Sequence, residues 1–239
     1  MLMIVDLPSL FSLHKIIKKL IELTKMGING LVFEKKTCTN QKSETGIGHE
    51  LANFISIFVA PPTMAIVATV SFSLWSPIGL GLLSAPFSIL LCFFCFSFFP
   101  FLSVLYFYRK KDTDLYVSNR EKRAPIFLIA IFSYSMASII FLGTNTKIML
   151  LLALGSLLVS LISMAVNLFW KVSIHCAGVT GPIFALIFVF GLNALPLTSI
   201  VGLVGWSRIT LKNHTFAQTL VGTLISLTVG LVVYPMLYI

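Results

Sequence analysis

The sequence predicts an all-α protein, a polytopic bundle of about six or seven helices that cross a membrane. Hydrophobic residues make up 57% of the 239 residues and charged residues only 10%, whereas soluble domains are about half apolar and about a quarter charged. Several apolar stretches also exceed the roughly 18 residues that mark a membrane-spanning helix. The short alternating segments of a β-barrel are not seen.

Residues 1–50 form the one long polar stretch, and we expect them to be a separate segment before the membrane domain. Within SLHKIIKKLIELTKMG the leucines and isoleucines share one helical face and the lysines largely cover the other. This pattern fits a helix on an anionic membrane surface, or equally a helix packed on the protein itself. A polar linker follows. Met1–Ser12 lacks a basic leader and a small-residue cleavage site, so we expect no cleavable signal.

Residues 51–239 form the predicted membrane domain, in which seven apolar segments follow one another. The sixth is the shortest. The segments cover residues 51–74, 79–108, 125–142, 148–170, 176–193, 197–209 and 214–239.

Basic residues are distributed very unevenly among the polar connections. Of the 17 Lys and Arg residues, all but Lys147 fall in the N-terminal region or in the connections after the second, fourth and sixth segments. Since positively charged connections stay in the cytoplasm, the N-terminus and these three connections are predicted to be cytoplasmic. The chain then ends on the far side of a cell membrane.

The four cysteines indicate no disulfide framework of the kind found in secreted domains. Cys92 and Cys95 lie in an apolar run without a nearby histidine or carboxylate. We therefore interpret them as packing residues and predict no metal site and no cofactor.

Three polar segments precede the third, fifth and seventh apolar segments and are predicted to meet at one membrane face. They carry cationic and hydroxyl side chains with almost no carboxylate, a set suited to a phosphate or diphosphate group. The predicted phosphate ligands are Arg120, Arg123, Lys171, Ser173, Ser207 and Arg208, and the segments also supply His175 and His214.

The two histidines allow catalysis in addition to binding. A neutral imidazole can attack phosphorus while a second, protonated one donates to the leaving oxygen. In SRITLKNHTFAQ, the residues Ser207, His214 and Gln218 share one helical face, and Gln218 lies one turn after His214. The Gln218 amide oxygen can therefore accept the ring N–H and leave the other nitrogen to attack.

The three segments resemble the signatures of the type 2 phosphatidic acid phosphatase superfamily (PAP2). Ser207-Arg208, five residues, His214 and then Gln218 is similar to its third signature, which ends in Asp. Ser173-Ile174-His175 is similar to the second, usually Pro-Ser-Gly-His, and Arg123-Ala124-Pro125 resembles the end of the first.

The resemblance implies that His214 is the nucleophile that forms a phosphohistidine and that His175 is the acid for the leaving group. Ser173, Arg208 and either Arg123 or Arg120 would bind phosphate, without a metal. This chain departs from the pattern at Val172 and Ile174, in the Lys of the first signature and in Gln218, which replaces an Asp. Lys111, Lys122 and Lys171 are the alternatives for that Lys.

The expected function is an integral-membrane phosphatase for a lipid phosphate or an isoprenoid diphosphate. Membrane lipids would be its surroundings, nucleic acid is not expected as a partner, and the sequence leaves the oligomeric state open. Two alternatives remain. The first is a non-catalytic protein of the same fold that binds or transports lipid phosphates, in which Gln218 does not support turnover. The second is a structural subunit of a membrane complex.

Overall fold

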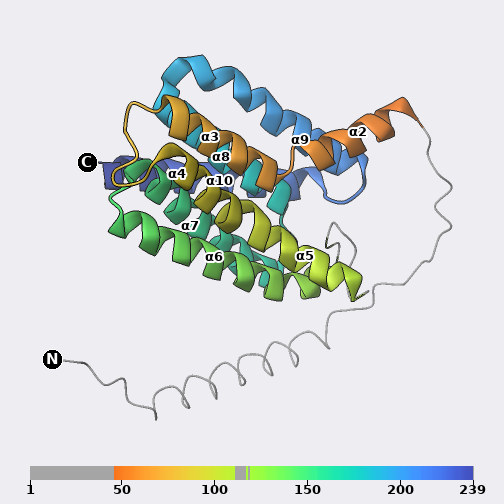
Figure 1. Cartoon of the computed structure of the whole chain (residues 1–239). Coiled ribbons are helices and arrows are strands. Elements are labelled where there is room, and N and C mark those ends of the chain that lie inside the picture. The colour runs from red at the N-terminus through yellow and green to blue at the C-terminus, as the bar shows by residue number, and fades with distance from the viewer. Residues whose placement is uncertain (1–45, 111–116, 118, 239) are drawn as a thin grey trace, which may run out of the picture. The chain divides into compact units, whose positions relative to one another are not determined.

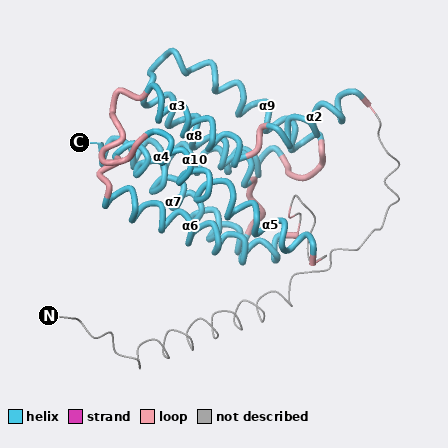
Figure 2. The backbone as a smooth tube through the Cα atoms, viewed as in Figure 1, coloured by secondary structure: helices cyan, strands magenta, loops and turns pink. Residues whose placement is uncertain are grey.

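The computed structural model describes residues 46–110, 117 and 119–238, and all regular structure within these ranges is helical (Figure 1). The predicted all-α bundle is thereby confirmed. Loops in these ranges are short connections between helices (Figure 2). The predicted basic segment lies in residues 1–45, outside the described residues. Five described helical stretches are long and apolar enough to cross a membrane, and α2 with α3 makes a sixth if this bent pair counts as one span.

The first described helices are α2 (Ile47–Phe58) and α3 (Pro61–Trp75), which meet at a bend of 51°. Pro61 and Pro62 occupy the first positions of α3, where a missing N–H costs little, and they end the preceding helix. The predicted linker through residue 50 is too long, because α2 already begins at Ile47. Glu50 in its first turn favours this start, since a carboxylate interacts well with a helix N-terminus.

A continuous stretch of 25 residues returns across the bundle as α4 (Ala85–Cys92), the π-helical η1 (Phe93–Phe98) and α5 (Phe99–Arg109). Two hydrogen bonds brace the π-helical part. The Ser97 hydroxyl donates to the Pro62 carbonyl at 2.9 Å, and the Ser133 hydroxyl donates to the Cys95 carbonyl at 2.8 Å. These bonds attach the π-helical part to two neighbouring helices.

The next helices are α6 (Ala124–Gly143), which follows the 3-10 turn η2 (Arg120–Arg123), and α7 (Lys147–Phe169). These two helices pack closely along their lengths. Small and apolar side chains of both belong to the main core, where Ala137, Phe141 and Ala153 are fully buried.

The chain from Ile174 to Thr210 consists of α8 (Ile174–Phe190), the 3-10 segment η3 (Gly191–Leu197) and α9 (Thr198–Thr210). The chain must reverse direction within this stretch, since His175 at its start is close enough to Arg208 near its end for the two to interact electrostatically. A straight helix would hold these residues about 50 Å apart. The turn begins at Gly191, whose φ of 65° is a conformation that glycine adopts readily. The fifth and sixth predicted segments therefore correspond to α8 and α9.

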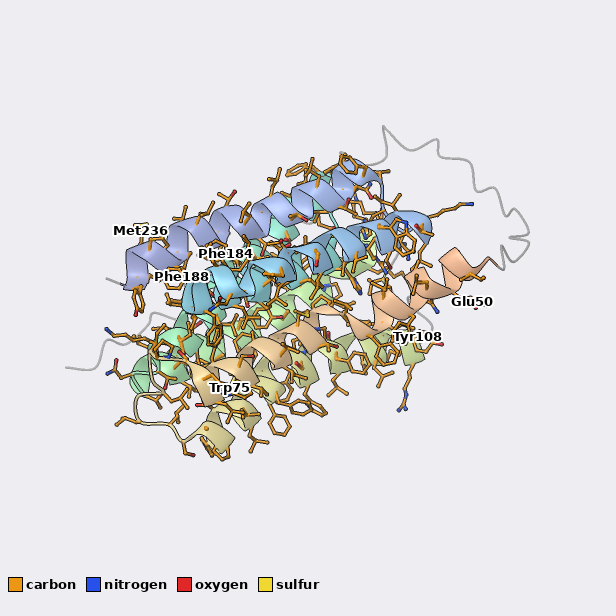
Figure 3. The ribbon with its side chains drawn as sticks, turned by 90° about the horizontal axis from the view of Figure 1, so that it is seen from above. Glu50, Trp75, Tyr108, Phe184, Phe188 and Met236 are labelled. Carbon is orange, nitrogen blue, oxygen red and sulfur yellow. The ribbon has the colours of Figure 1, made fainter. Side chains whose placement is uncertain are left out.

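The last helix, α10 (Phe216–Tyr238), packs against α7, α8 and α9. Figure 3 shows Glu50 and Tyr108 at one end of the bundle, and Trp75, Phe188 and Met236 at the other. The helices α6, α8 and α10 therefore begin at the end marked by Glu50, which we call the Glu50 end. The three polar segments predicted to meet do lie together at this end.

Candidate phosphate site at the Glu50 end

Arg123 connects the first polar segment with the second. Its side chain is 2% exposed, and its Nε donates to the Val117 carbonyl at 2.8 Å. Its Nη1 donates to the Val172 carbonyl at 2.9 Å. The guanidinium is thus fixed beside Ser173, the first residue of the second motif. Arg123, one of the two arginines left open by the sequence, is the one held at the site.

Arg120, the other arginine, lies one turn earlier in η2 and is half-buried. Its main-chain carbonyl accepts a hydrogen bond from Asn167 Nδ2 at 3.1 Å, which attaches η2 to α7. The described contact of Arg120 is therefore a backbone contact that positions the segment. Its predicted role as a phosphate ligand stays a prediction.

Ser173 caps α8 and joins the second polar segment to the third. Its hydroxyl oxygen accepts from the Cys176 N–H at 3.4 Å, as expected at the N-cap of a helix. Its own N–H donates to the Gln218 carbonyl at 3.1 Å. The hydroxyl hydrogen remains available for an anion, because the cap uses the oxygen only as an acceptor.

Arg208 and its neighbour Ser207 are both held by α2. The Arg208 side chain is 1% exposed, and its Nη1 donates to the Ser56 hydroxyl at 2.6 Å. The Ser207 hydroxyl donates to the Ala52 carbonyl at 2.6 Å. The single hydroxyl hydrogen of Ser207 is therefore engaged with α2, so in this structure Ser207 braces α9 and does not offer a donor to phosphate. The contacts with Ala52 and Ser56 were not expected from the sequence.

His214 lies in the connection between α9 and α10 and is 7% exposed. Its Nδ1 is 3.1 Å from Gln218 Oε1, the contact that the spacing predicted. The same Oε1 accepts the Thr215 N–H at 3.2 Å, and the Gln218 N–H donates to the Thr215 hydroxyl at 3.3 Å. Thr215 and Gln218 thus form a capping box at the start of α10.

The capping box decides the hydrogen positions on His214. A main-chain N–H can only donate, so the atom that it contacts must be the carbonyl oxygen of the Gln218 amide. That oxygen can only accept, and Nδ1 of the neutral ring must therefore carry the hydrogen. Nε2 then holds the lone pair, which is the tautomer required of a nucleophile. The Thr-x-x-Gln pattern was visible in the sequence, although its cap was not predicted.

Electrostatic effects show that the predicted residues lie close to one another. His175 interacts with Arg123, Arg208 and His214, and His214 interacts also with Lys171. Lys171 is itself held by a 2.8 Å bond from Nζ to the Asn213 carbonyl. The structure therefore brings together five of the predicted cationic or imidazole groups, which come from all three motifs.

The surroundings of this site favour an anion. The described residues contain two carboxylates, Glu50 and Glu121, and both are exposed. Three helices, α6, α8 and α10, also direct their N-termini to this end, and each N-terminus carries a partial positive charge of about half a unit. Guanidinium groups, a hydroxyl and helix N-termini are the groups that bind phosphate oxygens in proteins. The described residues contain no cluster of three or more metal-ligating side chains.

His214 is held in its neutral form. Burial is the main cause, and the positive charges of Arg123, Arg208 and Lys171 add to it, so that the pKa of His214 falls from 6.5 to about 3. We expect its ring signals in ¹⁵N-histidine NMR to show no titration between pH 5 and pH 8, with a pyrrole-type Nδ1 and a pyridine-type Nε2. A His214→Ala spectrum assigns the signals. Titration near pH 6.5 would contradict this environment.

The same pKa shift has a consequence for stability, because an unfolded histidine has the ordinary pKa of 6.5. Between pH 6.5 and about 3, the unfolded chain binds this proton and the folded chain does not. This group therefore favours the folded state above pH 6.5 and lowers the free energy of unfolding as the pH falls below that value.

Gly222 allows α10 to reach the second motif. A Cβ at this position would collide with the Ser173 carbonyl oxygen and would come within 3.5 Å of the Ala177 nitrogen. We expect Gly222→Ala to lower the melting temperature and to disturb ligand binding at the site. Gly202→Ala is the matched control, since a Cβ there meets nothing within 4 Å and alanine favours a helix. Equal behaviour of the two variants would contradict the close approach.

The fold and the site together define a polytopic helical membrane protein with a buried cationic site at one end of its bundle. No protein-family model, curated protein or solved structure matches this chain.

Proposed function

We propose that this protein is an integral-membrane phosphatase that releases phosphate from a lipid phosphate or an isoprenoid diphosphate through a phosphohistidine intermediate. The observation that carries the proposal is the arrangement around His214. Its Nδ1 is engaged by Gln218, Nε2 carries the lone pair, and Arg123, Arg208 and Lys171 surround it. The resemblance of the three motifs to PAP2 signatures supports the same assignment.

In the proposed reaction, Nε2 of His214 attacks phosphorus and the bond from phosphorus to the leaving oxygen breaks. The negative charge of the bound phosphate favours the protonated form of His175, which donates its proton to that oxygen, and Arg123 and Arg208 stabilise charge on the phosphoryl oxygens. Water then attacks phosphorus, the P–N bond breaks, and His175 takes up the proton that the water loses. The site residues need no metal for these steps.

The site lies at a bundle end, so an amphiphile can enter sideways from the bilayer with its chain remaining among lipids. We further propose that this end faces the cytoplasm, because the basic connections gather there. The protein would then belong to a cell membrane and act on lipids of the inner leaflet. A reporter fused after Ile239 that is active in the cytoplasm would overturn this orientation.

A substrate panel in the presence of EDTA tests the proposal. Purified protein should release inorganic phosphate from at least one short-chain lipid phosphate or prenyl diphosphate, and EDTA should leave the rate unchanged. No release from any member of the panel would refute the enzymatic proposal. Activity restored only by a divalent cation would refute the metal-independent mechanism.

Gln218 gives a second test, because a glutamate would keep the capping box and add a negative charge next to His214. That charge stabilises the imidazolium that develops when Nε2 attacks. We expect Gln218→Glu to raise kcat by about tenfold, which corresponds to about 1.4 kcal/mol. Gln218→Leu removes both contacts and should lower kcat. A decrease of kcat in Gln218→Glu would contradict this role.

The neutral amide of Gln218 also favours a second candidate function, a non-catalytic protein that binds or transports lipid phosphates. Gln218 orients His214 without supplying charge, which suffices for a binding site. In that case purified protein would bind lipid phosphates without releasing phosphate, and Gln218→Glu would not create turnover.

A further inference from the structure

A cavity of about 90 Å³ lies in the core of the bundle, next to the candidate site. Ile174 and Ala177, which flank His175 in α8, belong to its lining. From there it extends among α3, η1, α6, α7, α8 and α10. This volume accommodates several groups of the size of a water molecule.

Two buried hydroxyl groups line this cavity without a hydrogen-bond partner in the described part of the chain. They belong to Ser163 of α7 and Ser226 of α10, which are 2% and 1% exposed. Serine in a helix commonly bonds the carbonyl one turn before it, and neither hydroxyl does so here. Buried hydroxyls without a partner are rare in folded proteins, so these two require a partner inside the cavity, either water or a group of a bound molecule.

Asn167 lies beyond the residues that line the cavity, one turn nearer to the end of α7 than Ser163, and adds a buried acceptor there. Its side chain is 5% exposed. Its Nδ2 donates to the Arg120 carbonyl at 3.1 Å, and a carbonyl can only accept, so the orientation of the amide is fixed. The remaining Oδ1 is buried and has no partner among the described residues. It can be satisfied only by a donor.

We propose that Asn167, Ser163 and Ser226 form a subsite for a hydroxyl group that the lipid substrate carries close to its phosphate. The inference rests on the proposed function of the neighbouring site. A hydroxyl can donate to Asn167 Oδ1 and also accept from a serine. An ammonium group is disfavoured because Arg123 and Arg208 lie by His175, whose neighbour Ile174 lines the cavity, and the carboxylates among the described residues are exposed. A prenyl chain supplies no donor.

The depth of the cavity limits where this hydroxyl lies on the substrate. A Cβ placed on Gly181 would be 3.1 Å from the Ser226 hydroxyl, so Ser226 lies beside Gly181. Gly181 is six residues after His175 in α8, or about 9 Å along the helix. The hydroxyl therefore belongs to the first few carbons after the phosphate.

The test compares two lipids that differ in one hydroxyl group, a 1-acyl-glycerol 3-phosphate and its 2-deoxy analogue with the same acyl chain. Dissociation constants are measured with His214→Ala, which prevents turnover, and kcat/KM is measured with the otherwise unchanged protein. We expect the hydroxyl-bearing lipid to be preferred by about tenfold in both measurements, the size of one or two neutral hydrogen bonds.

Ser163→Ala, Ser226→Ala and Asn167→Leu should each reduce this preference to less than about threefold. The matched control is Ser138→Ala, because that hydroxyl already donates to the Tyr134 carbonyl at 2.8 Å within its own helix. The control should keep the full preference. Melting temperatures of all variants establish that they fold.

Equal binding of the two lipids would overturn the subsite and would mean that only water occupies the cavity. A preference that persists in all three variants would overturn it as well. If neither lipid is hydrolysed but the hydroxyl-bearing one binds more tightly in a Ser163- and Ser226-dependent manner, the phosphatase proposal fails and the subsite stands.

Discussion

Replacement of His214 by alanine should abolish phosphate release, with kcat at least about a thousandfold lower. The reason is that the structure aims one particular nitrogen. Gln218 Oε1 accepts a hydrogen bond from Nδ1–H, and burial together with the surrounding cations keeps Nε2 unprotonated. Without the ring, no other described side chain occupies this position with a lone pair. The measurement is release of phosphate from the best substrate of the panel.

Two controls make this result specific. His49→Ala removes an exposed histidine on α2 and should leave kcat unchanged. Rapid quenching with radiolabelled substrate should trap an acid-labile phosphoenzyme in the unchanged protein and none in His214→Ala. His175→Ala should slow formation of that intermediate when the leaving group is poor. Full activity of a folded His214→Ala protein would exclude the proposed nucleophile.

Replacement of Arg208 by alanine should lower kcat/KM by about 10²–10³-fold, as expected when a buried group that stabilises charge in the transition state is removed. The guanidinium is oriented by the 2.6 Å bond from Nη1 to the Ser56 hydroxyl, and it interacts with both site histidines. Arg208→Lys should recover part of the loss, since an ammonium keeps the charge but not the fork geometry.

Lys212 provides the matched control for Arg208. It lies four residues later, in the connection between α9 and α10, and its side chain is exposed. Lys212→Ala should change kcat/KM by less than about twofold. Ser56→Ala should give an intermediate loss, because Arg208 keeps its charge but loses one orienting contact. Equal losses in Arg208→Ala and Lys212→Ala would show that only the net charge of the membrane face matters.

Much of the fold was predictable, because membrane-spanning helices can be recognised in a sequence by their length and apolar composition. The segments 125–142 and 148–170 correspond closely to α6 and α7. The start of α2 was placed too late. The sequence marks that helix start only by one carboxylate in the first turn, Glu50, and the neighbouring polar residues are equally typical of a linker.

Contacts between site residues that are close together in the sequence could also be predicted from their spacing. His214 and Gln218 are one turn apart, and their contact needs only the helix geometry that both share. Arg123 and Ser173 were found by their motifs, but the carbonyls that hold Arg123 come from Val117 and Val172, which carry no distinguishing side chain. Every residue has a main-chain carbonyl, so the sequence does not show which carbonyl will accept a given hydrogen bond.

Ser207 shows the opposite difficulty. Its place on the face of His214 suggested a phosphate ligand, and the structure shows its hydroxyl donating to the Ala52 carbonyl. Residues separated by 155 positions along the chain make this bond. Helical periodicity predicts which side of a helix a residue occupies, but it does not predict which distant helix packs against that side. Gly222 is similar, since its importance depends on the Ser173 backbone that α10 approaches.

The contacts of α2 with α9 set an order for assembly in the membrane. Ser56 and Ala52 leave the ribosome more than 150 residues before Arg208 and Ser207, their partners. Until α9 docks on α2, the Ala52 carbonyl lacks the Ser207 donor and Arg208 has no Ser56 to orient it. The site is thus completed by the joining of an early helix and a late one, and ligand binding there would report that α9 has docked on α2.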